Sequence, residues 1–338
     1  MTPWQKKAFI IAEAGVNHGG SMDVARKLVE TAVAAGCDAV KFQSFRANAL
    51  ASPSAERAEY QKINVGGNES QFEMLKRLEL SFEQQAELKD YANKLGIIFF
   101  STAFDFESMD FLGRLDIPIW KIPSGEITNY LYLKRVGMLG KPIVLSTGMA
   151  TLAEVDDALR VLLESGAKRD QICILHCNTE YPTPFEDVNL RAMVNMGRAF
   201  GTAYGYSDHT LGMEVPVAAI ALGARIIEKH FTLDRNMTGP DHRASLEPAD
   251  LKAMMRAIRG VEQSLGDGVK RPTASEIGNR FVARKSIVAA RAIRAGEILG
   301  PDNLTVKRPG TGISAMRWDE VISRRAPRDF APDEQIEL

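Results

Sequence analysis

Two histidines are the residues of this chain whose type and position point most directly to chemistry. His209 and His230 each come at the end of a short apolar run, and the two runs are neighbours in chain order. A lone histidine in such a place is usually structural. Two imidazoles with no cysteine nearby suit a divalent cation whose other ligands are water, carboxylate or substrate oxygen. Manganese, magnesium, cobalt and zinc all accept such ligands, so the pair predicts a metal site without choosing the metal.

Two lysines, Lys41 and Lys121, lie within other apolar runs and predict a site for an anion. Burying two ammonium groups requires compensating negative charge. The phosphate and carboxylate of a small substrate would supply it, and an internal ion pair with Glu13 or Glu228 is the alternative. A second alternative is Schiff-base chemistry by one desolvated lysine. Short-range donors for a phosphate would come from hydroxyls, namely Thr102, Ser124, Ser146 and Ser207.

The scaffold that positions these side chains is predicted by eight short apolar runs that alternate with helical patterns. The expected strands are residues 8–14, 38–43, 97–101, 117–122, 142–147, 172–177, 202–207 and 224–230. Helix signals lie between them. Ser21 is a predicted N-cap, Thr151 with Glu154 is a predicted capping box, and Gly36, Gly96 and Gly166 are predicted helix ends. Eight such units predict an α/β fold, a (β/α)8 TIM barrel, with a doubly wound open sheet as the alternative.

Alternation along the strands predicts which side chains face the barrel interior. Residues of one parity point inward and residues of the other parity point to the helices. Each inward polar residue is ordinary by itself, but together they gather at the carboxyl ends of the strands, where barrel enzymes hold their active sites. These residues are Glu13, Lys41, Thr102, Lys121, Ser124, Ser146, Asn178, Ser207, His209, Glu228 and His230.

Composition changes along the chain predict two domains and a linker. Residues 1–266 hold the barrel pattern, residues 267–280 are rich in glycine, proline and polar residues, and residues 281–338 carry short strands and turns. The last segment is too small to bury much core by itself, so we expect a small, mostly-β domain that docks on a barrel. The insert at residues 47–80 is long for a βα loop and is expected to shape the substrate pocket.

The overall charge and the cysteines restrict the class of partner. The 338 residues carry 42 Lys and Arg against 43 Asp and Glu, and this balance offers no global field for nucleic acid or an anionic membrane. Cys37, Cys173 and Cys177 form no CxxC motif, which indicates a reducing compartment. An acidic residue interrupts the first apolar run too early for a secretory signal, and no run approaches the ~20 residues of a membrane span. We therefore expect a cytoplasmic protein with a small-molecule substrate.

A series of motifs in order resembles the sialic acid synthase (N-acetylneuraminate synthase) family over nearly the whole chain. The segment from Phe281 onward is similar to that family's antifreeze-like (SAF) domain. The motifs are IAEAGVNHGG, VKFQ, FFSTAFD, WKIPSGE, LSTGM, HCNTEYPTPFEDVNL, YSDHTLG, EKHFTLDRNMTGPDHRASLEP and KRPGTGI. The resemblance implies condensation of phosphoenolpyruvate with N-acetylmannosamine and water, with release of phosphate, on Mn2+, or on Mg2+ or Co2+ as alternatives.

The resemblance also implies roles for individual residues. His209 and His230 would bind the metal, and Glu13, Glu228 and Asp241 would lie near the aminosugar, the metal and the attacking water. Arg308 matches an arginine that the family's small domain inserts into the partner subunit's barrel, which implies a domain-swapped homodimer. Gly19 stands where the family commonly has Asn. The residues that would hold phosphoenolpyruvate are Lys41, Thr102, Lys121, Ser124, Ser146, Ser207 and Asn178.

Three other functions stay open from the sequence. Related synthases make legionaminic acid from a 2,4-diacetamido-2,4,6-trideoxy hexose, and we expect the insert at residues 60–80 and the loop after the last strand to decide between the two acceptors. A lysine-dependent aldolase would be trapped by borohydride with pyruvate and would ignore chelators. A non-catalytic sugar-acid binding protein would bind its ligand yet release no phosphate.

Overall fold

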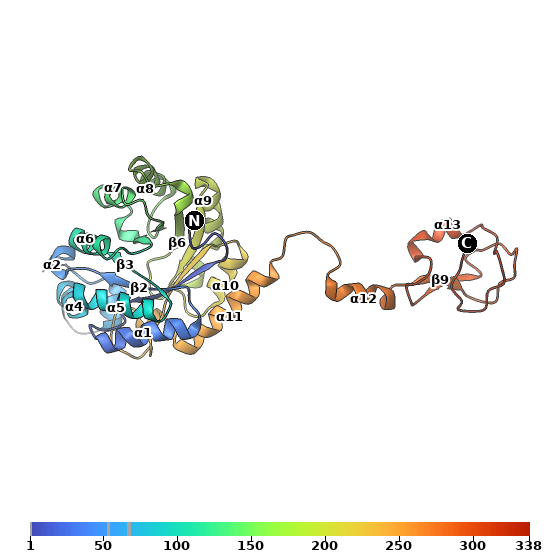
Figure 1. The fold of residues 1–338 in the computed structure, drawn as a ribbon, viewed down its shortest axis with the longest axis horizontal. Coiled ribbons are helices and arrows are strands. Elements are labelled where there is room, and N and C mark those ends of the chain that lie inside the picture. The colour runs from blue at the N-terminus through green and yellow to red at the C-terminus, as the bar shows by residue number, and fades with distance from the viewer. Residues whose placement is uncertain (1, 53–54, 66–68) are drawn as a thin grey trace. The chain divides into compact units, whose positions relative to one another are not determined.

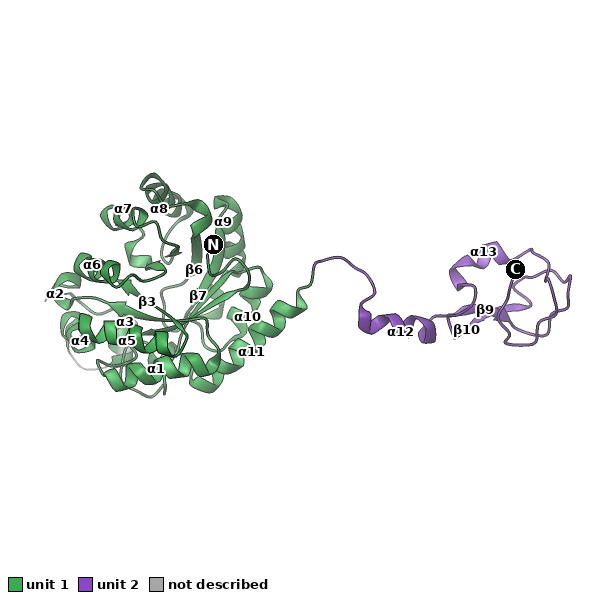
Figure 2. Ribbon diagram, in the orientation of Figure 1, with its two compact units in different colours: residues 1–266 green, residues 267–338 purple. Residues whose placement is uncertain are grey.

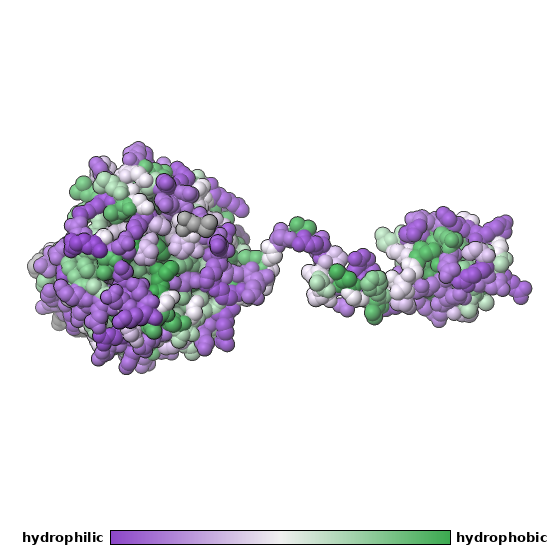
Figure 3. All heavy atoms as spheres, viewed as in Figure 1, coloured by the Kyte–Doolittle hydropathy of each residue, from purple (hydrophilic) through white to green (hydrophobic). Residues whose placement is uncertain are grey.

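The computed structural model describes residues 2–52, 55–65 and 69–338, apart from the side chains of Tyr60 and Ile63. The chain divides into two compact units, Met1–Gly266 and Asp267–Leu338, which Figure 2 colours separately. On the face drawn in Figure 3, hydrophilic side chains predominate and apolar residues form small groups. Within the described ranges, no helix has the length and apolar character needed to cross a membrane.

The first unit is built on an eight-stranded parallel sheet in the order β3-β2-β1-β8-β7-β6-β5-β4. The two end strands, β3 and β4, also lie side by side, so the sheet curls into a nearly closed barrel. This confirms the (β/α)8 prediction over the open sheet. The strands are β1 Phe9–Gly15, β2 Ala39–Ser44, β3 Ile98–Ala103, β4 Trp120–Ile122, β5 Ile143–Ser146, β6 Ile172–Cys177, β7 Ala203–Asp208 and β8 Ile226–His230.

Helices surround these strands (Figure 1). They are α1 Met22–Ala35, α2 Ala47–Leu50, α3 Glu59–Val65, α4 Gln71–Leu78, α5 Phe82–Lys94, α6 Phe106–Arg114, α7 Tyr130–Gly137, α8 Leu152–Glu164, α9 Leu190–Phe200, α10 Glu214–Ala221 and α11 Pro248–Ser264. Short 3-10 helices are η1 Ser124–Glu126, η2 Arg169–Gln171, η3 Phe185–Asp187 and η4 His242–Ala244. The insert between β2 and β3 is thus helical, contributing α2, α3 and α4.

Local sequence signals begin and end these helices as predicted. The Ser21 side chain accepts a hydrogen bond from the backbone of Val24 at the start of α1, and Gly36 ends that helix with a φ of 82°. Thr151 and Glu154 form both halves of the capping box of α8. Gly19 has a φ of 58°, a conformation that Asn also tolerates, so its departure from the family pattern suits the backbone.

The register of the barrel strands brings the predicted residues together. β1 places Glu13 beside Lys41 on β2 and beside His230 on β8, while β7 places Ser207 beside Glu228 on β8. The alternate residues of these strands pack against the surrounding helices in an apolar cluster that includes Ile10, Ala12, Val40, Phe42, Leu28 and Leu251. Strand parity therefore sorts the polar interior from a largely apolar exterior, as the sequence predicted, with Asp208 and Lys229 as charged exceptions on the outward face.

The second unit contains a small antiparallel sheet of β9 Ser286–Ala289 and β10 Leu304–Lys307, with α12 Ala274–Ala283, η5 Ala315–Arg317 and α13 Trp318–Val321. Its core is small and gathers side chains from the sheet and the surrounding loops, including Ile287, Leu299, Val321 and Phe330. The segment expected as a linker, residues 267–280, holds the start of α12. The physical reason is a capping box of Thr273 and Glu276, which begins a helix directly after the glycine- and proline-rich stretch.

Candidate functional site

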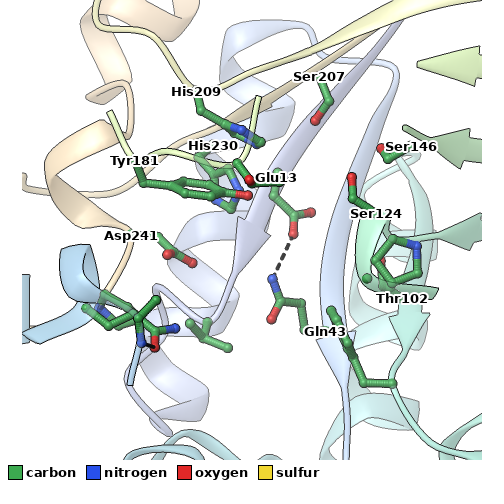
Figure 4. A pocket seen from close by; sticks show the side chains of 18 of the residues that line it. Glu13, Gln43, Thr102, Ser124, Ser146, Tyr181, Ser207, His209, His230 and Asp241 are labelled. Atoms are coloured by element: carbon green, nitrogen blue, oxygen red, sulfur yellow. Dashed lines mark hydrogen bonds between the residues drawn. The ribbon is translucent and has the colours of Figure 1, made fainter. Parts of the chain in front are cut away.

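A cavity of about 550 Å³ lies at the carboxyl ends of the barrel strands. Figure 4 shows Tyr181, His209 and His230 on one side of it, Ser124 and Ser146 on the other, and Glu13 between them. The predicted residues that line the cavity are Glu13, Lys41, Thr102, Lys121, Ser124, Ser146, Ser207, His209, Glu228, His230 and Asp241. The structure thus brings together residues from β1, β2, β3, β4, β5, β7 and β8 with loop residues.

Lys41 connects three strands at the base of this cavity. Its ammonium lies 2.8 Å from Oε2 of Glu13 on β1 and donates to Oγ1 of Thr102 on β3 at 2.9 Å. Oε1 of Glu228 on β8 is 3.8 Å away. Burial lowers the pKa of Lys41, but the carboxylates of Glu13 and Glu228 outweigh that effect and leave the pKa above its ordinary value. Lys41 is therefore a permanent cation in the cavity.

Lys121 makes a second, weaker set of contacts. It donates to Oγ of Ser146 at 2.8 Å and lies 3.5 Å from Oε1 of Glu228, which also accepts from Ser207 at 3.3 Å. Burial lowers the pKa of Lys121, and Glu228 offsets this only in part. Both lysines therefore form the internal ion pairs considered as an alternative from the sequence, and both still line the cavity, where a substrate anion can compete for them.

The two glutamates differ in their acidity. Burial raises the pKa of Glu13 to about 7, although Lys41 acts to lower it. Burial also acts to raise the pKa of Glu228, but Lys121 and Lys41 outweigh it and hold the net pKa below the ordinary value. At neutral pH Glu228 is a fixed carboxylate, whereas Glu13 is poised to take or give a proton.

The histidine pair lies at the ends of β7 and β8, with ring centroids 5.5 Å apart. His209 Nδ1 donates to the carbonyl of Asn178 at 2.5 Å, which leaves Nε2 as its free nitrogen. The ring of Tyr181 stacks on His209 at 4.0 Å and meets the edge of His230 at 5.7 Å. Burial lowers the pKa of His209 to about 4 and that of His230 well below its usual range. Both imidazoles are therefore neutral, the form that binds metal.

These two imidazoles fit a divalent cation as far as the protein's own donors go. Nδ1 of His230 is buried and has no hydrogen-bond partner among the described residues. Buried polar atoms normally have a partner, so this nitrogen is available to bind a ligand. No group of three or more His, Cys, Asp or Glu side chains in the described ranges surrounds one ion position. The chain would therefore supply two nitrogens and leave the other positions to water or substrate.

Of the remaining predicted residues, Ser124 and Asp241 line the cavity from outside the strands, whereas Asn178 and Arg308 are not among its described lining residues. Ser124 lines the cavity while its Oγ accepts from the backbone of Gly148 at 2.9 Å. Burial raises the pKa of Asp241 to about 6. The side chain of Asn178 is not among the described groups that line the cavity, because its Oδ1 accepts from the backbone of Glu180 at 2.7 Å. Arg308 belongs to the second unit, where its Nε donates to the carbonyl of Ala283 at 2.9 Å.

The cavity is also lined by residues that the sequence did not predict, including Gln43 and Tyr181. Gln43 donates to Oε1 of Glu13 at 3.4 Å, and strand alternation from Lys41 would have found it. Tyr181 lies in the loop after β6, where no periodic signal exists. The insert, which we expected to shape the pocket, lines the cavity with an apolar wall from α2 and α4, formed by Leu50, Met74, Leu75 and Leu78, and with the polar residues Glu59, Gln61 and Gln71. Residues 53–54 and 66–68 of the insert lie outside the described residues.

The fold and the cavity define a barrel enzyme whose site lies at the carboxyl ends of parallel strands. Residues 28–270 match the NeuB family and residues 284–337 match the SAF domain. The chain therefore belongs to the NeuB family, which confirms the resemblance to sialic acid synthases and to their C-terminal domain, and it is an enzyme.

Relatives extend this similarity over almost the whole chain. The N,N'-diacetyllegionaminic acid synthase of Campylobacter jejuni is 52% identical over 98% of this chain and 99% of its own length. The protein of the same name from Legionella pneumophila is 44% identical over 94% of this chain and 90% of its own length. The crystal structure of N-acetylneuraminic acid (sialic acid) synthetase from Leptospira borgpetersenii has a TM-score of 0.70 and 32% identity, covering 80% of this chain and 90% of that one.

Proposed function

We propose that this enzyme condenses phosphoenolpyruvate with an N-acylated aminosugar and water, releasing inorganic phosphate. The observation that carries the proposal is that two buried ammonium groups and two neutral imidazoles share one cavity. The ammonium groups suit the phosphate and carboxylate of phosphoenolpyruvate, because charge-assisted hydrogen bonds to such oxygens are strong. Hydroxyls around them add further donors from Thr102, Ser124, Ser146 and Ser207.

His209 and His230 would hold the divalent cation, for which we propose Mn2+, with Mg2+ or Co2+ as alternatives. When bound, the cation supplies Lewis-acid polarisation of the aldehyde oxygen of the open-chain sugar. Tyr181 covers the faces and edges of the two rings and so restricts their motion. The low pKa of His209, about 4, keeps its ring available as a ligand across the physiological pH range.

The carbon–carbon bond forms between C3 of the enol and the aldehyde carbon of the sugar, and positive charge then develops at C2. Water adds to C2 and gives its proton to Glu13, whose pKa of about 7 suits a general base. Glu228 stays ionised and stabilises the positive charge. The sugar alkoxide takes up the proton that Glu13 accepted. The tetrahedral intermediate then loses its C2 hydroxyl proton and breaks its bond from C2 to the bridging oxygen, so that phosphate leaves with that oxygen and a 2-keto acid remains.

For the acceptor we propose a 2,4-diacetamido-2,4,6-trideoxy hexose, with N-acetylmannosamine as the alternative. Two relatives at 52% and 44% identity are named diacetyllegionaminic acid synthases. The wall of α2 and α4 supports the same choice. Leu75 and Leu50 on this wall are partly buried and pack on a cluster with Phe45 and Met74, so they present carbon rather than hydrogen-bonding groups to the cavity. A C6 methyl and a second acetyl methyl suit such a surface better than hydroxyls do.

We also propose that Arg308 reaches the cavity of a partner subunit in a domain-swapped homodimer. The match of residues 284–337 to the SAF domain supports this, because the family resemblance assigns that arginine to the small domain. Arg308 carries a guanidinium at a surface position of the second unit, where a carbonyl or carboxylate of a substrate can accept from it.

The test is release of inorganic phosphate from phosphoenolpyruvate with Mn2+, measured in parallel with the diacetamido trideoxy hexose and with N-acetylmannosamine. We expect kcat/KM to be at least tenfold higher with the diacetamido sugar. The Leu75→Gln variant should narrow that ratio, because it adds a polar group to the apolar wall. A higher kcat/KM for N-acetylmannosamine would contradict the proposed acceptor and favour N-acetylmannosamine instead. The absence of phosphate release with either sugar would refute the proposed reaction.

A further inference from the structure

A fully buried ion pair lies directly behind the histidine pair, on the opposite face of the same two strands. Lys229 of β8 contacts Oδ2 of Asp208 on β7 at 2.5 Å, and both side chains are 0% exposed. The same ammonium donates to the carbonyl of Thr210 at 2.5 Å. The Thr210 hydroxyl in turn donates to Asp208 at 2.9 Å, and its backbone N–H donates to the same oxygen at 3.1 Å. We call Asp208, Thr210 and Lys229 the rear cluster.

The rear cluster holds the chain on both sides of His209. Asp208 precedes that histidine and Thr210 follows it, and Lys229 binds the first through its carboxylate and the second through its carbonyl. Lys229 is itself the residue before His230. Asp208 and Lys229 are also the last residues that pair in the ladder between β7 and β8. The ladder of backbone hydrogen bonds between β7 and β8 ends at this pair. The contacts of the rear cluster therefore hold the two backbone segments that carry the histidines just where that ladder ends.

Stability is a poor explanation for such a cluster. Replacing a buried ion pair with apolar residues of similar size is often neutral or stabilising, because the desolvation cost of both charges disappears. The outward residues of β1 and β8 beside it pack in an apolar cluster that includes Ile10, Ala12 and Ile227, although the charges of Arg235 and Glu214 also act on Lys229. An apolar pair would suit this layer, so the charges are better explained by the geometry that they impose.

We propose that the rear cluster is a positioning device that sets His209 relative to His230, so that both imidazoles reach one cation. This inference rests on the proposed function for its cation. The ion pair bridges the two strands, while the bond from Lys229 to the Thr210 carbonyl fixes the turn just beyond His209. The ring of His209 is then oriented by the bond from its Nδ1 to the Asn178 carbonyl and by stacking on Tyr181.

The decisive variant is the double substitution Asp208→Leu with Lys229→Met, measured as metal-free protein without substrates. Mn2+ affinity is determined by titration calorimetry or by electron paramagnetic resonance, and thermal unfolding is followed in parallel. We expect the double variant to unfold at a temperature equal to or above that of wild type and to bind Mn2+ at least tenfold more weakly. Mn2+ affinity within twofold of wild type in the folded double variant would overturn the proposal.

The matched control is Arg259→Met, which breaks a partly buried ion pair with Asp38 at 2.5 Å in another part of the barrel. This variant should lower the unfolding temperature and leave Mn2+ affinity unchanged. Should the double variant fail to fold, Thr210→Val decides, because it removes one hydroxyl at nearly constant shape. A threefold or greater loss of Mn2+ affinity in Thr210→Val supports the proposal, and wild-type affinity contradicts it.

A metal-free measurement separates this inference from the proposed function. If wild-type protein binds neither Mn2+, Mg2+ nor Co2+, the proposed metal site is wrong. The Nδ1–H proton of His209, assigned in NMR spectra by its loss in His209→Gln, then reports the geometry directly. A shifted resonance in the double variant, with the wild-type position in Arg259→Met, supports the positioning role. An unchanged resonance in both variants refutes it.

Discussion

The two units of the chain use the same charged residue types in opposite ways. In the barrel, Glu13, Lys41, Lys121 and Glu228 surround one cavity, and each is at most 4% exposed. In the C-terminal unit, Lys307 pairs with a surface aspartate, and the two side chains are 52% and 60% exposed. Water screens the surface pair, whereas the buried charges interact strongly and shift the pKa of one another. The difference teaches that burial in the barrel raises a carboxyl pKa, as for Glu13, whereas hydrogen bonds at the surface lower one, as Arg291 does for Glu297.

The largest expected effect is at the histidine pair of the barrel. His209→Ala should reduce phosphate release by at least ~10³-fold, because the polarisation that a cation supplies is worth several kcal/mol. The measurement is steady-state phosphate release with added Mn2+, repeated after treatment with a chelator. His176→Gln is the control, since His176 contacts the backbone of Val188 instead. A wild-type rate for His209→Ala in chelator-treated buffer would refute the metal assignment.

A smaller loss is expected when one buried cation is removed. Lys121→Met should raise the KM for phosphoenolpyruvate ~10- to 100-fold, because a hydrogen bond to a charged group contributes about 1.5–3 kcal/mol. The KM for the aminosugar should change less. Lys141→Met serves as the matched control, because Lys141 pairs with Asp116 at the surface. If Lys121→Met and Lys141→Met changed the KM for phosphoenolpyruvate equally, the proposed difference between buried and exposed lysines would be wrong.

The buried glutamates should give the enzyme a pH dependence. The pKa of Glu13 is raised to about 7 by burial, so its carboxylate form is lost as the pH falls through 7. If Glu13 is the base, kcat/KM should fall about tenfold for each pH unit below this value. In Glu13→Gln the rate should be low and this limb should be absent. A flat wild-type profile between pH 6 and pH 8 would assign the base elsewhere.

Arg308 is the one charged residue of the C-terminal unit for which we expect a role in catalysis, unlike the surface pairs of that unit. If it reaches a partner's cavity, Arg308→Ala should raise the KM for the aminosugar ~10-fold and the KM for phosphoenolpyruvate much less, as expected for a directed hydrogen bond from a charged group. Analytical ultracentrifugation of the same variant checks the assembly state. Equal changes in both KM values would contradict a role at the acceptor, and a monomeric wild type would exclude the swapped arrangement.

The smallest effect is expected at the surface pair of that unit. Lys307→Met should change the free energy of unfolding by no more than about 0.5 kcal/mol, as is usual for exposed substitutions. Its kinetic constants should match those of wild type in the phosphate release assay. A large kinetic effect would show that this surface is buried in the active assembly and that the contrast between the units is incomplete.

The sequence determined the scaffold and most of the site. Strand parity is a local property, so the inward positions of Glu13, Lys41 and Glu228 follow from alternation once the strands are located. Helix limits at Ser21 and Gly36 follow from capping chemistry within a few residues. The order of the motifs along the chain is specific enough to predict the family from the sequence alone.

Only the tertiary structure decided how these residues interact. The pairing of Lys121 with Glu228 joins β4 to β8 across the cavity, and the difference in pKa between Glu13 and Glu228 depends on burial and on distances that no local pattern encodes. The Asn178 side chain accepts a hydrogen bond from the backbone N–H of Glu180, a contact that strand parity does not predict. Periodicity reports the face on which a side chain lies, whereas electrostatic energies depend on separations between segments distant in the chain.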